Sequence, residues 1–325
     1  MPQIPSPDSP LPDPVAAGHL DVGQGHRLAW WEYGRADAPP VVLLHGGPGA
    51  GSNPAVLRSL DLARWRVLRF DQRGCGESTP HASTEANTTA HLIDDLEQLR
   101  ERFGVPAWAV MGHSWGSCLG LAYAQAHPGR VTALRLSGVF TARRQEVAWW
   151  FRGVRSLFPD HWEAFAAHVP AAERGDLLAA YHRRLMDPDP AVHLPAGIAL
   201  RGFSARTQTF RPDPAHIANL TEPAKALAVS RLFADYCLHG AWLEEGQLLR
   251  EVGRIRHIPA AIVQARYDVV TPAITAFELH QAWPEADFAI VNDGNHTTEE
   301  PEVHQALCAA AARLRERVGE ARSGG

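Results

Sequence analysis

The segment that most constrains the fold of this chain is Gly112-His113-Ser114-Trp115-Gly116. An apolar run typical of a buried strand precedes it at 108–111, and an Ala/Leu-rich stretch typical of a helix follows at 117–127. The five residues fit a G-x-S-x-G turn, in which a serine sits on a sharp, strained bend between strand and helix. Close backbone packing at such a bend leaves no room for a Cβ atom two residues before or after the serine, which explains both glycines. The sequence therefore predicts Ser114 as a nucleophile at the carboxyl end of a strand.

Strand and helix patterns alternate on both sides of this turn. Apolar runs occupy 41–44 and 65–70, a helical pattern covers 88–103, and a further strand is expected at 131–136. Strand patterns return at 259–264 and 287–291, before a last helix over 301–318. Such alternation predicts parallel pairing through crossover connections, and hence an α/β fold with a mostly parallel central sheet flanked by helices.

The sheet pattern is interrupted by about a hundred residues that are helical in character. Residues 141–250 are rich in Ala, Arg, Trp and Leu, are broken by prolines, and contain no convincing strand. Ligands bind at the carboxyl edge of an open α/β sheet, so this insertion is expected to cover the site as a cap. We predict a Pro-rich tail over residues 1–18, an α/β core over 19–140 and 251–325, and a helical cap over 141–250.

Two residues at later strand ends complete a catalytic relay with Ser114. A serine needs a base that a third group orients, and the α/β-hydrolase fold places them in the order Ser, Asp or Glu, His. Asp268 follows the strand at 259–264, and His296 follows the strand at 287–291. Asp293 is the rival for the acid, but it lies on the same loop as His296.

Acyl transfer also needs backbone donors for the developing oxyanion. The N–H of Trp115, directly after the nucleophile, is one expected donor. The second is expected from the loop His45-Gly46-Gly47-Pro48-Gly49, which follows the strand at 41–44. We predict Gly47 as the donor and Gly46 as a residue at which the backbone closely approaches the substrate.

Composition narrows the possible ligands. The net charge is −5, with no run of Lys and Arg, so neither nucleic acid nor a membrane surface is expected as a partner. Seventeen histidines show no metal-ligand spacing, and no metal or other cofactor is expected. The four separated cysteines are typical of reduced thiols, the first residues lack a signal-peptide pattern, and no apolar run is long enough for a membrane span. A cytoplasmic protein that acts on small molecules or short peptides is therefore expected.

Several motifs together resemble those of proline iminopeptidases. They are HGGPG at 45–49, DQRGCGES at 71–78, the Ser114 turn with its Trp, and RYDVV at 266–270. The likeness extends from about residue 20 to 315. It implies the α/β-hydrolase fold, a helical cap, an oxyanion hole at Gly47 and Trp115, no cofactor, and release of N-terminal proline from small peptides.

The sequence departs from this family at the amine-binding positions. The family carries a Trp-x-x-Trp-Glu motif and a later glutamate in the cap, and these two glutamate positions hold Phe203 and Phe233 here. A buried ammonium without a partner is costly, so substitute carboxylates are sought at Asp235, Glu222, Glu244 and Glu299.

The same departure leaves two other functions open. The first is an esterase, lactonase or amidase for an uncharged apolar acyl group, with Phe203 and Phe233 in its substrate pocket. The second is a binding protein without catalysis, against which the complete set of catalytic residues argues. His113, unusual within the turn, is expected to pack beside the sheet and to take no part in chemistry.

Overall fold

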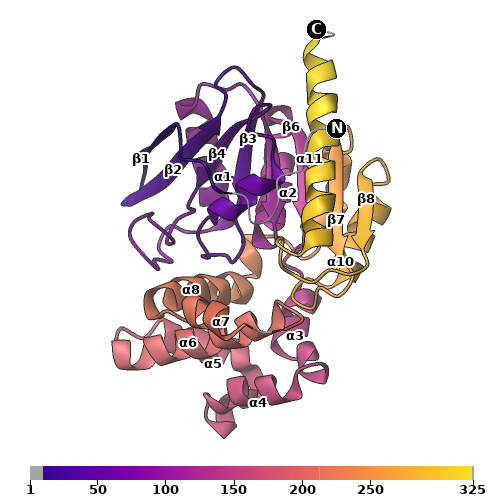
Figure 1. The fold of residues 1–325 in the computed structure, drawn as a ribbon. Helices are drawn as coiled ribbons and strands as arrows, with labels where there is room; N and C mark the ends of the chain where they lie inside the picture. The colour runs from indigo at the N-terminus through magenta and orange to yellow at the C-terminus, as the bar shows by residue number, and fades with distance from the viewer. Residues whose placement is uncertain (1–9, 212, 324–325) are drawn as a thin grey trace.

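Eight strands form a single sheet in the computed structural model, which describes residues 10–211 and 213–323 (Figure 1). They are β1 (Ala16–Gly23), β2 (His26–Gly34), β3 (Pro40–Leu44), β4 (Arg66–Phe70), β5 (Trp108–His113), β6 (Val131–Ser137), β7 (Ala260–Ala265) and β8 (Asp287–Val291). Their spatial order is β1-β2-β4-β3-β5-β6-β7-β8. The pairs β1–β2 and β2–β4 are antiparallel and the others are parallel, which confirms the mostly parallel α/β sheet.

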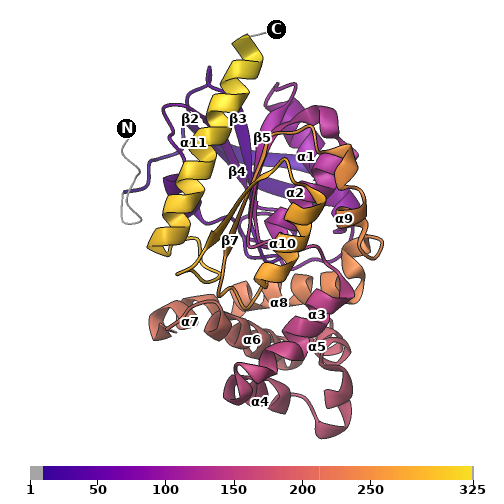
Figure 2. The ribbon, with the colours of Figure 1, turned by 90° about the vertical axis from the view of Figure 1, so that its right-hand side faces the viewer.

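Helices cover both faces of the sheet (Figure 2). The helices in and around the core are α1 (Thr89–Arg102), α2 (Trp115–Ala126), α9 (Gln247–Arg250), α10 (Ala273–Ala282) and α11 (Pro301–Ser323). Val42 and Val110 pack into one apolar cluster with α1, α2, α9 and α10, whereas Val41 and Met111 pack into a second cluster with α11. Successive side chains of a strand point to opposite faces, so these central strands are apolar on both sides.

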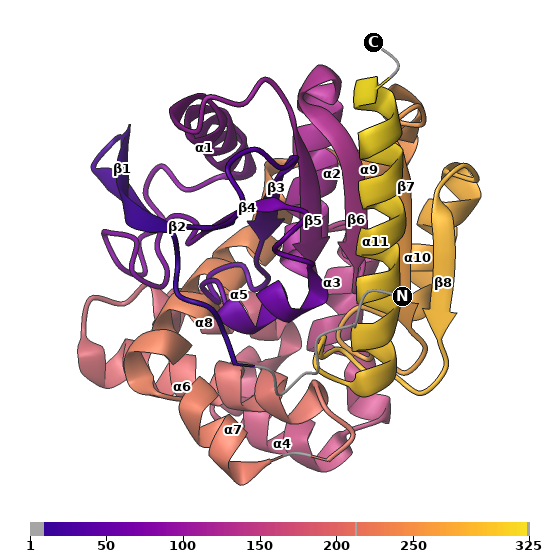
Figure 3. The same cartoon turned by 45° about the horizontal axis from the view of Figure 1, so that its top comes forward.

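Six of the helices described between β6 and β7 form a layer across one end of the sheet (Figures 1 and 3). They are α3 (Arg144–Phe151), α4 (Pro159–Ala167), α5 (Leu177–Leu185), α6 (Pro190–Thr207), α7 (Pro214–Leu220) and α8 (Pro223–Leu238). We call them the helical layer. It has its own apolar cluster, separate from the two clusters of the sheet, so its helices pack mainly on one another.

The chain ends differ in part from the expectation. β1 begins at Ala16, inside the segment predicted as a tail, because residues 16–23 pair with β2 through backbone hydrogen bonds. Residues 1–9 of that predicted tail lie outside the described residues. The last helix continues past the expected Val318 to Ser323. None of the helices in the described part of the chain has the length and apolar character to cross a membrane.

Candidate active site

Ser114 occupies a strained bend between β5 and α2. Its φ of 57° and ψ of −126° are unusual for a residue with a side chain. A Cβ atom at Gly112 would lie 2.0 Å from the carbonyl oxygen of Gly116, and one at Gly116 would lie 2.1 Å from that of Leu44. Both positions therefore require glycine, and the bend presents Ser114 where strand β5 ends.

The structure brings Asp268 and His296 into direct contact. Asp268 follows β7 and His296 follows β8, and Nδ1 of His296 lies 2.8 Å from Oδ2 of Asp268. Oδ1 of Asp268 accepts from the backbone N–H groups of Val270 (3.0 Å) and Thr271 (2.8 Å). The Thr271 hydroxyl donates to Oδ2 (2.8 Å). These donors fix the carboxylate, which in turn orients the imidazole ring. Asp293, the rival acid, is exposed.

The electrostatic environment keeps the Asp268 carboxylate charged. Burial opposes the charged form, but the His296 ring and the hydrogen bonds from Thr271 outweigh it, so the pKa of Asp268 lies below its usual value. His113 lies against the relay, with its ring centroid 4.8 Å from that of His296. Burial, followed by the charge of His296, lowers the pKa of His113 to about 3. His113 is therefore a neutral neighbour of the relay, closer to it than the sequence suggested.

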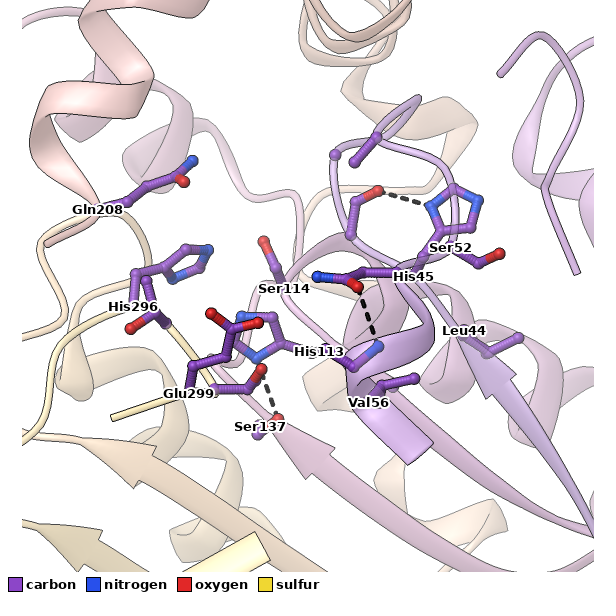
Figure 4. A pocket seen from close by; sticks show the side chains of 18 of the residues that line it. Leu44, His45, Ser52, Val56, His113, Ser114, Ser137, Gln208, His296 and Glu299 are labelled. Atoms are coloured by element: carbon purple, nitrogen blue, oxygen red, sulfur yellow. Dashed lines mark hydrogen bonds between the residues drawn. The ribbon is translucent and has the colours of Figure 1, made fainter. Parts of the chain in front are cut away.

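Ser114 and His296 line the same cavity of about 350 Å³ between the sheet and the helical layer. Figure 4 shows the Ser114 hydroxyl near the His296 ring, with Gln208 approaching from the helical layer and Glu299 from the loop after β8. Walls from both parts of the fold therefore enclose the candidate nucleophile.

Two predicted oxyanion elements flank Ser114. Gly46 and Gly47 line the cavity, and a Cβ atom on Gly46 would lie 3.2 Å from the Cβ atom of Ser114. Gly47 has a φ of +116°, and a Cβ atom there would lie 2.6 Å from the nitrogen of Gly49. Trp115 is the first residue of α2, so its backbone N–H has no acceptor within that helix. The 45–49 loop thus lies against Ser114, and the N–H groups of Gly47 and Trp115 stay the predicted oxyanion donors.

A hydrogen-bond network that the sequence did not reveal joins the two oxyanion elements. The N–H of Gln72 donates to Nε2 of His45 (3.0 Å), so Nδ1 of His45 carries the hydrogen that reaches the Gly46 carbonyl (2.8 Å). The Gln72 side chain donates to the His45 carbonyl (3.0 Å) and accepts from the Trp115 indole (2.9 Å). Gln72 thus ties the 45–49 loop to the start of α2. In the sequence, only the position of Gln72 within the DQRGCGES motif could have indicated this role.

Comparisons with known proteins agree with this architecture. The family described as "alpha/beta hydrolase fold" matches residues 39–299. A proline iminopeptidase of Xylella fastidiosa is 44% identical over 299 residues, which are 91% of this chain and 96% of that protein. A proline iminopeptidase of Arabidopsis thaliana is 41% identical over 310 residues, 94% of this chain and 82% of that protein. The chain belongs to the proline iminopeptidase family of α/β-hydrolases.

A solved structure shows the same fold at lower sequence identity. The crystal structure of a proline iminopeptidase from Mycobacterium smegmatis superposes with a TM-score of 0.63 at 19% identity. The match covers 94% of this chain and all of that chain. At this identity the likeness concerns the fold alone.

Phe203 and Phe233, which the sequence predicts to stand at the glutamate positions of the family, belong to an aromatic cluster. Phe203 stacks on Phe165 (4.8 Å between centroids) and meets the edge of Trp150 (5.3 Å). Phe233 packs on Trp150 (4.8 Å) and on Phe151 (5.9 Å). Phe233 and Trp150 line the cavity, whereas Phe203 is buried behind them. This part of the wall is therefore apolar.

The substitute carboxylates lie in different places. Asp235 pairs with His182 (2.9 Å) and His239 (3.3 Å), away from the cavity. Glu222 caps the start of α8, and Glu244 pairs with Arg250 at the surface (2.7 Å). Among the described residues, only Glu299 brings a carboxylate to the cavity wall. Within 10–211 and 213–323, no group of three His, Cys, Asp or Glu side chains could hold a metal ion.

Proposed function

We propose that this protein is a serine hydrolase that releases N-terminal proline from small peptides. The observation that carries the proposal is the 41–44% identity with proline iminopeptidases over more than nine-tenths of the chain. The cavity of about 350 Å³ supports it, because this volume lies at the small end of ligand pockets and suits a short peptide. The helical layer acts as the cap that closes this cavity.

The catalytic roles follow from the positions of the side chains. His296 takes the proton of Ser114, whose oxygen attacks the carbonyl carbon of the substrate, and Asp268 stabilises the resulting imidazolium. The N–H groups of Gly47 and Trp115 stabilise the tetrahedral oxyanion. His296 then protonates the leaving amine, and water, activated by the same imidazole, hydrolyses the acyl-enzyme.

Glu299 is the carboxylate that we assign to the substrate amine. An aminopeptidase holds a protonated amine close to the scissile bond, and a charge taken out of water needs a partner. Glu299 lies three residues after His296 and lines the same cavity, where it remains exposed to solvent (Figure 4). The peptide would thus enter with its amine toward the loop after β8.

The apolar wall supports a second candidate, an esterase, lactonase or amidase for an uncharged acyl group. Phe233 and Trp150 on the cavity wall, with Phe203 behind them, favour an apolar acyl group over an ammonium.

We also propose a cytoplasmic location, because all four cysteines are free thiols and three of them are buried.

Two measurements test the proposed function. Ser114→Ala is expected to lower kcat by several orders of magnitude, because the acyl-enzyme cannot form. Near-normal turnover in this variant would refute the assignment. A proline arylamide should be cleaved far faster than its N-acylated form. The reverse preference, or a preference for a short-chain aryl ester, would favour the second candidate.

A further inference from the structure

A cationic side chain faces the cavity without a carboxylate partner. Arg201, Ser204 and Gln208 all line the cavity, and their spacing of three and four residues puts them on one face of α6 and its last turn. The side chain of Arg201 is buried, and Ser204 is its only hydrogen-bond partner among the described residues. This face of the helical layer is polar, in contrast to the wall formed by Phe233 and Trp150.

The hydrogen bonds of this face leave several donors without an acceptor. Nη1 of Arg201 donates to the Ser204 hydroxyl oxygen (3.3 Å), and Nε2 of Gln208 donates to the same oxygen (3.1 Å). The Ser204 oxygen thus accepts two hydrogen bonds, and its own hydrogen remains a donor. Nε of Arg201 is buried without any partner. A ligand that satisfies Arg201 and Ser204 must therefore accept hydrogen bonds.

Burial makes the charge of Arg201 costly. A guanidinium out of water is normally paired with a carboxylate or hydrogen-bonded throughout. Burial lowers the pKa of Arg201 to about 10, so it is still charged at neutral pH. Arg58, Arg69 and Arg135 also line the cavity wall, and all three have partners in the protein. Arg69 donates to the carbonyl of Ser52 (2.8 Å), and Arg135 donates to that of Leu307 (3.3 Å).

We propose that Arg201, assisted by Ser204 and Gln208, binds a carboxylate of the substrate. The planar fork of a guanidinium matches the two oxygens of a carboxylate. The inference rests on the proposed function and narrows its substrates to short prolyl peptides that carry a carboxylate beyond the scissile bond. This carboxylate is either the free C-terminus of a dipeptide or an acidic side chain after the proline. Glu299 and Arg201 then serve the two charged ends of one small zwitterion.

Three peptides with the same N-terminal proline separate these sources. Prolyl-alanine carries a C-terminal carboxylate, prolyl-alanine amide carries none, and prolyl-aspartic acid α-amide carries only a side-chain carboxylate. We expect the native enzyme to cleave at least one of the two acids with a kcat/KM about tenfold or more above that of the neutral amide. The acid that it prefers identifies the source.

Substitutions in α6 test the role of Arg201 in this preference. Arg201→Met should reduce the preference for the acid to near unity, mainly through KM, and Arg201→Lys should restore part of it. Arg206→Met is the matched control, because Arg206 lies on the same helix, donates to the Gly202 carbonyl (2.8 Å) and is outside the cavity wall. It should keep the full preference. Equal acid preference in Arg201→Met and the native enzyme would overturn the inference.

Calorimetric titration separates this inference from the proposed function. Ser114→Ala should bind the preferred acid about tenfold or more tightly than the neutral amide. The double variant Ser114→Ala/Arg201→Met should lose this difference. If Arg201-dependent binding occurs without cleavage of any peptide by the native enzyme, the proposed function fails and the carboxylate site stands. Equal affinity for acid and amide, or no binding of any of the three peptides, refutes the carboxylate site.

Discussion

Asp268→Asn should inactivate the relay while leaving its geometry almost unchanged. Five groups around the carboxylate can donate hydrogen bonds to it, and two of them are the backbone N–H groups of Val270 and Thr271. These two N–H groups can only donate, so the carbonyl oxygen of an asparagine must face them. Its NH₂ group then faces Nδ1 of His296 and the Thr271 hydroxyl, both of which can accept. The third neighbour, Nε2 of Gln264, lies 3.5 Å away and has closer acceptors in the carbonyls of Ala265 and Thr271. His296 must therefore carry its proton on Nε2, where it can no longer take the proton of Ser114.

The size of the fall in kcat depends on the free-energy cost of the other orientation of the asparagine amide. The reverse orientation would restore the tautomer, but it would set the NH₂ group against two backbone donors at about 1–3 kcal/mol each. The inactive tautomer should therefore dominate. We expect kcat to fall by about 10⁴, which corresponds to about 5.5 kcal/mol in the activation free energy.

The assay is the hydrolysis of the best substrate at neutral pH, with burst kinetics to count active sites. Asp293→Asn is the matched control, because Asp293 is an exposed acid on the loop of His296. That control should retain kcat within a factor of about two, and thermal unfolding should show that both variants are folded. A kcat for Asp268→Asn within tenfold of the native value would refute this account of the relay.

Two further predictions concern buried charge. Arg73→Met should lower the free energy of unfolding by about 3–5 kcal/mol at pH 8, because it strips the buried Asp95 of its bidentate partner (2.7 Å). Urea unfolding measures this loss, which should shrink at pH 5, where the isolated carboxyl can bind a proton. His113 has its pKa lowered to about 3, so the unfolded state binds a proton that the native state refuses between pH 6.5 and 3. Native stability should therefore decrease as the pH is lowered from 6.5 to 3. His113→Gln should reduce the slope of stability against pH by up to about 1.4 kcal/mol per pH unit. An unchanged slope would contradict the assigned cause.

Much of the core could be predicted because its signals are local. Apolar runs separated by helical patterns specify a parallel sheet, since strands buried on both faces lack polar alternation. The glycines at 112 and 116 specify the bend at Ser114, because a Cβ atom at either position would collide with a carbonyl oxygen. Asp268 and His296 were placed at strand ends by the same reasoning. The extension of the sheet to Ala16 was missed, since its pairing with β2 lies outside any local pattern.

The sequence by itself determined the α/β fold, the family and the candidate catalytic residues, because turn sterics and strand order act within short segments. Only the tertiary structure decided which side chains of the helical layer reach the cavity. It placed Phe233 on the wall and Phe203 behind it, left Glu299 as the carboxylate of the wall among the described residues, and turned Arg201 inward. These outcomes depend on how six helices pack on one another and over the sheet, and no periodicity within a single helix specifies that packing.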